Sequence, residues 1–327
     1  MPERLEQLKR WLETELEFRD YTITPASADA SFRRYFRVLH NGVSFIVMDA
    51  PPEKEDSHPF IDVSRRLYDG GLNVPEVFDQ DLEQGFLLLS DLGSMSYLGA
   101  LDARRVERLY ADALAALASI QVCNCDGLPP YDRDLLLREM ELFREWLVGK
   151  HLGIALDERQ HAMLDHVFAL LADNALAQPQ VFVHRDYHSR NLMVTTCNNP
   201  GILDFQDAVC GAITYDLVSL LRDCYVEWPR AQVEEWALGY RELALQSGIL
   251  HEEYEDPRQF LRWFDLMGMQ RHLKAAGIFA RLNHRDGKPG YLADIPRTLG
   301  YVTEVASRYD ELVAFGEVVQ QAVLDRL

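Results

Sequence analysis

Hydrophobic residues in the first part of the chain follow two spacings. Leu5, Leu8, Leu12 and Leu16 recur every three or four positions, which predicts an amphipathic helix over residues 3–18. The runs that follow are short, rich in β-branched and aromatic residues and bounded by turn residues, as is typical of strands. We expect strands at residues 21–24, 35–39, 44–50, 75–78 and 86–90. One short helix is expected at residues 59–69, between the third and fourth of these strands. The first part of the chain is therefore predicted to be rich in β-sheet.

From about residue 103 onward the apolar positions repeat with helical spacing. Three stripes predict helices at 106–120, 135–147 and 163–171, and further helices are expected near 216–226, 230–247, 257–282 and 294–325. Pro229, Pro257 and Pro296 lie at or near the starts of the last three, where a missing N–H costs little. The sequence thus predicts an α+β fold with a small sheet-rich lobe, residues 1–90, and a larger, mostly helical lobe, residues 91–327.

A polar loop between apolar runs carries the candidate chemistry. Asp186 and Asn191 follow the apolar residues 181–183, and Asp204 follows a second apolar run. Phosphoryl transfer uses such a set: one carboxylate takes the proton of the attacking hydroxyl, while an amide oxygen and another carboxylate hold Mg²⁺ on the nucleotide phosphates. Three unrelated polar loop residues are the alternative, but their joint spacing between apolar strands favours a phosphoryl-transfer site.

The composition narrows the function classes. Of the 327 residues, 48% are hydrophobic and 26% are charged, which argues against extensive disorder. The net charge of −19 argues against nucleic-acid binding, which needs a basic face. No apolar run approaches the roughly 18 residues of a membrane helix, and the first residues are charged where a signal peptide is apolar. The five cysteines suit reduced thiols, so we expect a cytoplasmic enzyme.

The motif and the order of the lobes resemble the aminoglycoside phosphotransferase family, whose fold is related to protein kinases. The resemblance covers nearly the whole chain. It implies a protein-kinase-like fold that binds ATP and Mg²⁺, with Asp186 as the catalytic base and Asn191 and Asp204 as metal ligands. It also implies that His184 orients the loop and that Asp216 caps a helix beneath it.

The expected nucleotide site departs from that of the protein kinases. Residues 87–92 match the hinge of the family, where backbone groups near Ser90 and Leu92 would bind adenine. Met48 stands where kinases carry the lysine that contacts the α and β phosphates. The phosphate loop is poor in glycine, and its candidate residues are Ser31, Phe32, Arg33 and Arg34.

Arginine offers a replacement for the missing lysine, because its guanidinium group binds phosphate oxygens bidentately and stays charged. We hypothesise that Arg33 or Arg34, together with Ser31, takes this role. A solvated strand end is the alternative, and both interpretations stay open at this point.

The substrate is expected to be a small molecule. Asp204 and Asp216 are only twelve positions apart, which leaves no room for the long activation segment of protein kinases. Residues 138–146 and the basic segment 267–297 resemble one branch of the family, the anomeric amino-sugar kinases. That resemblance implies phosphorylation of N-acetylmuramate and N-acetylglucosamine at the C1 hydroxyl, giving sugar 1-phosphates for UDP-sugar synthesis in peptidoglycan recycling.

Several side chains are candidates for the sugar site. N-acetylmuramate carries a lactyl carboxylate, which a local cationic patch would attract in this acidic chain. Sugar hydroxyls favour carboxylates and amides, and an aromatic side chain can stack on the ring. The candidates are Glu139, Asp207, Asp223, Arg271 and Asn283, with Trp146, Tyr225, Trp228 or Trp263 for stacking. Alternatively, the basic segment is a helix face whose salt bridges hold the C-terminal helices.

Two other functions stay open from the sequence. A kinase for another small hydroxylated metabolite, or for an aminoglycoside, would keep the same loop. A nucleotide-sensing pseudokinase is suggested by Met48, although nucleotide binding alone does not need the base that Asp186 offers.

Overall fold

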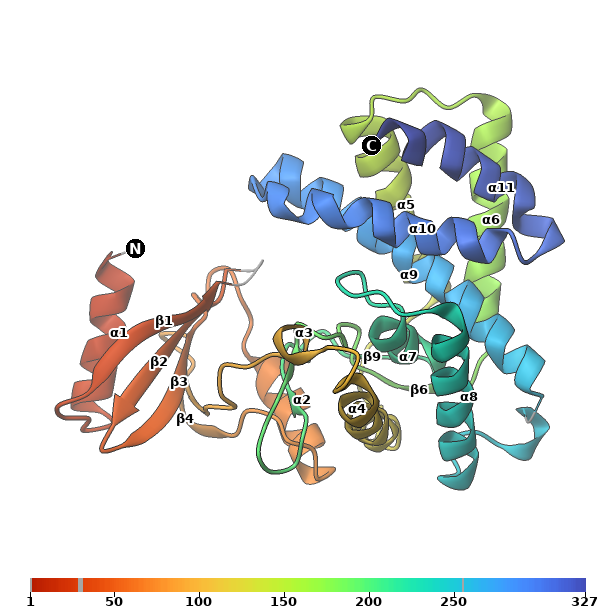
Figure 1. Ribbon diagram of the computed structural model, residues 1–327. Coiled ribbons are helices and arrows are strands. Elements are labelled where there is room, and N and C mark those ends of the chain that lie inside the picture. The colour runs from red at the N-terminus through yellow and green to blue at the C-terminus, as the bar shows by residue number, and fades with distance from the viewer. Residues whose placement is uncertain (1, 29–31, 255) are drawn as a thin grey trace. The chain divides into compact units, whose positions relative to one another are not determined.

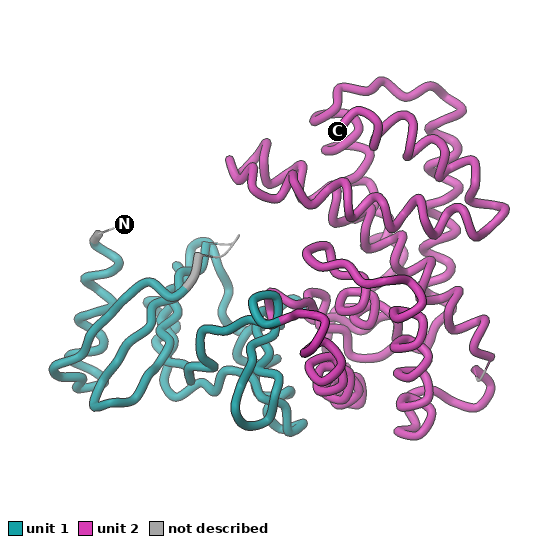
Figure 2. Tube along the Cα trace, viewed as in Figure 1, with its two compact units in different colours: residues 1–100, 192–207 teal, residues 101–191, 208–327 magenta. Residues whose placement is uncertain are grey.

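The computed structural model describes residues 2–28, 32–254 and 256–327. The chain forms two compact units (Figure 2). Unit 1 comprises Met1–Ala100 and Leu192–Asp207, and unit 2 comprises Leu101–Asn191 and Ala208–Leu327. The α+β class that the sequence predicts is confirmed, because unit 1 is built on a sheet and unit 2 is mostly helical.

Unit 1 contains a five-stranded antiparallel sheet in the order β1-β2-β3-β5-β4. The strands are β1 (Thr22–Ala28), β2 (Arg34–His40), β3 (Val43–Asp49), β4 (Val77–Asp81) and β5 (Phe86–Ser90). All five lie at or near predicted strands. Their alternating side chains leave one apolar face, and α1 (Pro2–Thr14) covers it (Figure 1). The contact consists mainly of Leu8, Trp11 and Leu12 against Phe36, Val38, Val47, Phe86 and Leu88.

The rest of unit 1 joins two distant parts of the sequence. Helix α2 (His58–Asp69) lies between β3 and β4 in sequence, and the short α3 (Tyr97–Ala100) follows β5. Strands β7 (Leu192–Met193) and β8 (Gly201–Ile202) form a hairpin, and among the described residues they do not join the five-stranded sheet. Instead, Val194 donates to the Met95 carbonyl and Ile202 donates to the Asn73 carbonyl, both over 2.8 Å. These bonds tie residues 192–207 to the first hundred residues, a connection that a division near residue 90 leaves out.

Unit 2 is built around α9, which runs from Pro257 to Asp286 and contacts α5, α6, α7, α8 and α10 (Figure 1). It buries residues on most of its faces, as expected of a helix surrounded by others. The other α-helices of unit 2 are α4 (Val106–Gln121), α5 (Arg133–Leu142), α6 (Glu158–Leu176), α7 (Thr214–Leu221), α8 (Arg230–Gln246), α10 (Ile295–Ala306) and α11 (Val313–Val318). Short β6 (Gln180–Val183) and β9 (Val209–Ala212) form an antiparallel pair.

Two predicted helices have other bounds in the structure. The helix expected over 135–147 continues from α5 into a π-helix, η1 (Phe143–His151). The helix expected over 294–325 is divided into α10, α11 and shorter 3₁₀ and π segments. The short segments of unit 2 are η2 (Glu252–Tyr254), η3 (Pro289–Asp294), η4 (Asp310–Leu312), η5 (Val319–Val323) and η6 (Leu324–Arg326).

A glycine allows α9 to approach η1 closely. A Cβ atom at Gly277 would collide with the backbone of Leu142 and Phe143. Because only glycine avoids this collision, Gly277 lets the two backbones meet where α5 becomes the π-helix. In the described part of the chain, no helix, including α9, is both long and apolar enough to cross a membrane.

Candidate active site

The loop between β6 and residue 191 is held by a carboxylate of α7. Asp216 accepts hydrogen bonds from the backbone N–H groups of His184, at 2.6 Å, and Arg185, at 3.0 Å. Arg185 has a φ of +77°, a backbone conformation that is strained for a residue other than glycine. The prediction that Asp216 caps a helix is wrong: Ile213 is the N-cap of α7, and Asp216 instead fixes the strained loop.

Asp186 is oriented through its backbone. Its N–H donates to Nδ1 of His184 at 3.3 Å, and its carbonyl accepts from Nδ2 of Asn191 at 3.0 Å. His184 is fully buried, and its orienting role stays a prediction. Within the described chain, the Asp186 carboxylate itself accepts no hydrogen bond from a protein donor, and the residue is half-buried. The carboxylate is therefore available to a ligand.

Cations of unit 2 keep the Asp186 carboxylate charged. Burial raises the pKa of Asp186, but the positive charges of Lys274 first, and of Arg185 and Arg271 after it, outweigh burial and lower the pKa. An ionised carboxylate can accept a proton, whereas a protonated one cannot. The surroundings of Asp186 therefore suit a base.

Glu139 lies at the centre of a buried charge cluster. Its carboxylate forms ion pairs with Arg185 at 2.5 Å and Lys274 at 3.1 Å, and it accepts a hydrogen bond from Tyr131. Lys274 also donates to the Tyr215 hydroxyl at 2.9 Å. These donors occupy Glu139, which the sequence suggested as a sugar contact, and give it a positioning role for two cations beside Asp186.

Asp223 supports the second half of the loop. Its carboxylate accepts from the Ser189 backbone N–H at 2.9 Å, from the Ser189 hydroxyl at 2.5 Å and from the Tyr225 N–H at 3.0 Å. The Tyr225 ring in turn lies under the guanidinium of Arg190, 3.6 Å from the ring centroid, and beside the ring of His188. Asp223 thus organises an aromatic and a cation next to the loop.

The other sugar candidates of unit 2 occupy different places. Arg271 is buried and contacts the thiol of Cys224. Asn283 is half-buried on the same helix, twelve residues further, which corresponds to about 18 Å along α9. Of the stacking candidates, Trp263 is buried. Trp228 donates to the Tyr110 hydroxyl, and Trp146 lies under Lys150, so Tyr225 is the aromatic candidate that neighbours the loop.

The predicted second metal ligand and Asp207 belong to unit 1. Asp204 has a φ of +64°, and its carboxylate accepts from the side-chain amide of Gln206 at 2.7 Å. The adjacent Phe205 is fully buried and packs on Phe60 with ring centroids 4.9 Å apart. The buried ring anchors the strained residue before it, whereas Asp207 is exposed.

The expected hinge follows β5. The Ser90 N–H donates to the Glu76 carbonyl at 2.9 Å, and the Ser90 hydroxyl accepts from the Glu76 N–H at 2.9 Å. Asp91 pairs with Arg37 at 2.6 Å, and Leu92 is half-buried. Leu92 contacts the β8 region, where a Cβ atom at Gly201 would meet its side chain.

The arginines of the expected phosphate loop form ion pairs. Arg33 pairs with Glu55 at 3.1 Å, and Arg34 pairs with the fully buried Asp49, which also binds Arg4. Phe32 is exposed, with Lys54 over its ring. Ser31 lies outside the described residues. Met48 is fully buried in β3, opposite Tyr35 and Leu87.

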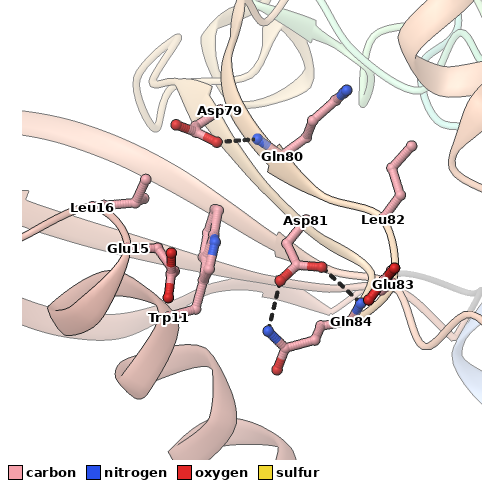
Figure 3. Close-up of a pocket in the computed structure, with 9 residues that line it drawn as sticks. All are labelled: Trp11, Glu15, Leu16, Asp79, Gln80, Asp81, Leu82, Glu83 and Gln84. Atoms are coloured by element: carbon pink, nitrogen blue, oxygen red, sulfur yellow. Dashed lines mark hydrogen bonds between the residues drawn. The ribbon is translucent and has the colours of Figure 1, made fainter.

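A cavity of about 450 Å³ in unit 1 contains none of the predicted site residues (Figure 3). It lies where the end of α1 faces the turn between β4 and β5, and its lining includes Trp11, Glu15 and Gln84. Asp81 directs its carboxylate to hydrogen bonds with Gln84 within this turn. The cavity therefore has no part in the candidate active site.

Lys274 and Arg185 are site residues that the sequence did not reveal to us. Lys274 follows Arg271 by three positions on a helix, and residues at this spacing share a face. The spacing from Arg271 therefore indicates that Lys274 lies on the same face of the helix. Arg185 gave no comparable signal, because its role depends on Glu139, which lies 46 positions away.

The Asp186 carboxylate lies on the loop after β6, and Asn191 donates to the backbone carbonyl of the same residue. Residues 22–261 match the model of the "Phosphotransferase enzyme family". The chain belongs to this family.

Named relatives match the chain over nearly its whole length. It is 49% identical to the "N-acetylmuramate/N-acetylglucosamine kinase" of Pseudomonas putida, with 98% of each chain covered. It is 46% identical to the enzyme of the same name from Pseudomonas aeruginosa, covering 97% of this chain and 96% of that one. Among solved structures, the choline kinase of Streptococcus pneumoniae matches with a TM-score of 0.62 at 14% identity, over 92% of this chain and 98% of that one. The protein-kinase-like fold is thereby confirmed.

Proposed function

We propose that the protein transfers the γ-phosphoryl group of ATP to the anomeric hydroxyl of N-acetylmuramate and N-acetylglucosamine. The observation that carries this proposal is the open, ionised carboxylate of Asp186 in a chain that matches kinases of this name over nearly its full length. The sugar 1-phosphates would then supply UDP-sugar synthesis in peptidoglycan recycling. Because the reaction consumes ATP, we place it in the cytoplasm.

Asp186 is the proposed base. Its carboxylate would accept the proton of the sugar hydroxyl as that oxygen attacks the γ-phosphorus in line, and the ADP oxygen would leave on the opposite side. An anomeric hydroxyl is more acidic than an ordinary alcohol, so a carboxylate with a low pKa is a sufficient base. The His184 and Asn191 contacts hold the Asp186 backbone, and this fixes where the carboxylate can reach.

Asn191 and Asp204 are the proposed Mg²⁺ ligands. Asn191 uses Nδ2 as a donor to Asp186, so a metal at this residue would bind its oxygen, Oδ1. Asp204 offers a carboxylate, and both groups are hard oxygen donors of the kind that Mg²⁺ prefers alongside water and phosphate oxygens. When bound, the metal would neutralise charge on the phosphates.

The nucleotide is proposed to bind residues of unit 1. Because the Ser90 N–H is occupied by Glu76, the backbone groups from the Ser90 carbonyl to Leu92 are the ones that would meet adenine. Arg33 or Arg34, together with Ser31 and Phe32, is proposed to contact the phosphates in place of the lysine absent at Met48. Both arginines already have carboxylate partners, which would hold their guanidinium groups in position.

The sugar is proposed to bind residues of unit 2 near Asp186. Tyr225 would stack on the ring, while Arg271 and Asn283 would contact its polar groups. Glu139 and Asp223 would act indirectly, since both bind neighbouring residues. The exposed Asp207 is kept as a candidate for a sugar hydroxyl.

The test is ADP release by the wild-type enzyme with ATP, Mg²⁺ and a sugar panel. N-acetylmuramate and N-acetylglucosamine should be turned over, and the methyl glycoside of N-acetylglucosamine, in which C1 carries no hydroxyl, should not. Turnover of the methyl glycoside would refute transfer to C1. Silence across the whole panel, with nucleotide still bound, would instead support a pseudokinase.

A further inference from the structure

Arg271 is a buried cation without a carboxylate partner in the described chain. It is 5% exposed, its Nε has no hydrogen-bond partner, and a terminal nitrogen lies 3.6 Å from the Cys224 sulfur. Three similarly buried cations among the described residues, Arg222 (4% exposed), Arg241 (6%) and Lys274 (8%), each form an ion pair. Because an unpaired buried charge is costly, Arg271 requires an explanation.

The acidic residues near Arg271 do not pair with it. Asp223 directs its carboxylate to Ser189 and Tyr225. Glu139 binds Lys274, one turn further along α9. Asp186 feels the positive charge of Arg271 but forms no ion pair with it.

We propose that Arg271 binds the carboxylate of the acceptor, the lactyl group of N-acetylmuramate, and so determines the preference between the two amino sugars. This inference rests on the proposed function. The basic composition of segment 267–297 suggested a cationic patch for this carboxylate, and Arg271 is the residue of that segment proposed to bind it.

The chemistry of the two substrates favours this partner. N-acetylmuramate and N-acetylglucosamine differ by the lactyl ether, so its carboxylate is the negative charge that one acceptor has and the other lacks. A guanidinium offers a planar fork that binds a carboxylate bidentately. Arg271 belongs to the same unit as Asp186 and is close enough to influence its charge. An acceptor bound at Asp186 would therefore bring its own carboxylate into the neighbourhood of this fork.

The transferring phosphoryl group is the other anion that could use Arg271. It is common to both reactions, whereas the carboxylate occurs in one. A comparison of substrates therefore separates the two partners.

The experiment compares the wild type with Arg271→Met on three acceptors: N-acetylmuramate, its uncharged methyl ester, and N-acetylglucosamine. We expect KM for N-acetylmuramate to rise about 10- to 100-fold, the usual range for a lost charge-assisted hydrogen bond, with kcat little changed. KM for the ester and for N-acetylglucosamine should rise far less than KM for N-acetylmuramate, since neither ligand offers a carboxylate to Arg271. Arg271→Lys keeps the charge but not the fork, and should give an intermediate KM for N-acetylmuramate.

Arg262→Met is the matched control. Arg262 lies on the same helix, and it pairs with Glu311 at 2.7 Å on an exposed face. This variant should leave all three acceptors unchanged.

Two outcomes would overturn the inference. One is an equal loss on all three acceptors, which would assign Arg271 to the phosphoryl group or to folding. The other is an unchanged KM for N-acetylmuramate in Arg271→Met. If Arg271→Met does not fold, equal constants for Arg271→Lys and the wild type on N-acetylmuramate, or a uniform loss on all acceptors, would overturn it in the same way. Failure of the proposed function is distinct, because the wild type would then phosphorylate none of the acceptors.

Discussion

The Asp216 carboxylate lies 2.6 Å from the backbone nitrogen of His184, which donates a hydrogen bond to it. Burial raises the pKa of Asp216 to about 7, although the His184 and Arg185 N–H donors oppose this. The unfolded value is about 3.9, so the folded state binds more protons between these two values. Stability from this group is therefore present below about pH 4 and is lost as the pH rises towards 7.

Asp216→Asn should remove this pH dependence. The free energy of unfolding of the wild type, relative to that of the variant, is expected to fall by about 2–3 kcal/mol between pH 5 and pH 8. Urea unfolding of both proteins at the two pH values measures this difference. A difference that stays constant, or that grows with pH, would show that Asp216 is already ionised at pH 5.

Asp186→Asn should lower kcat by roughly 10²–10⁴, the usual contribution of a positioned base. KM for the sugar should change little, because the amide keeps the shape and the backbone contacts of Asp186. Steady-state kinetics with a circular-dichroism check of folding make the test. A loss below tenfold in a folded variant would exclude Asp186 as the base.

The ion pair between Glu139 and Lys274 should show strong coupling. Glu139→Gln leaves Lys274 and Arg185 without their shared carboxylate, and is expected to cost about 3–5 kcal/mol of stability. Adding Lys274→Met should restore part of this loss, because one of the stranded charges is then gone. Free energies of unfolding of the wild type, the two single variants and the double variant form a double-mutant cycle, which gives the coupling energy between the two side chains. Simple additivity would mean that the two side chains do not interact in solution.

One arginine of the phosphate loop should replace the kinase lysine. Arg33→Ala or Arg34→Ala is expected to raise KM for ATP by about tenfold, the value of one lost charge-assisted hydrogen bond. Arg66→Ala is the control, since Arg66 forms a helix-surface pair with Asp62 in the same unit. Wild-type KM and kcat in both loop variants would leave these arginines as a strand end held by Glu55 and Asp49.

Gly277→Ala should destabilise the protein by about 1–3 kcal/mol, the usual cost of overpacking. The added Cβ would push α9 away from Leu142 and Phe143. Gly239→Ala on α8 is the opposite case, because a Cβ there meets nothing within 4 Å and should add up to about 1 kcal/mol through helix propensity. Thermal unfolding compares the two. Equal melting temperatures for both variants would mean that α9 adapts without cost.

Local sequence patterns predicted the elements but not their long-range partners. Strands β2, β3 and β5 and helix α1 follow from the spacing of their apolar residues, because burial acts on each element in turn. The hairpin at 192–207 joins unit 1 through Asn73 and Met95. This pairing depends on residues about a hundred positions away, so no local period could reveal it.

The candidate site shows the same limit. The spacing of Asp186 and Asn191 was sufficient to predict their loop, since the chemistry requires both within a short segment. Asp223 looked like a sugar ligand by residue type alone, but its hydrogen bonds serve Ser189 and Tyr225. Tertiary packing decides whether a carboxylate faces a ligand or holds the loop. The residue type alone does not predict this packing.

The position of the transferred phosphate tests the central claim most directly. The product of the wild-type enzyme with ATP and N-acetylglucosamine should be examined by proton and phosphorus NMR. We predict one phosphate on C1, seen as a coupling between the phosphorus and the anomeric proton. A phosphate on any other hydroxyl, or no phosphorylated sugar at all, would contradict transfer to the anomeric oxygen.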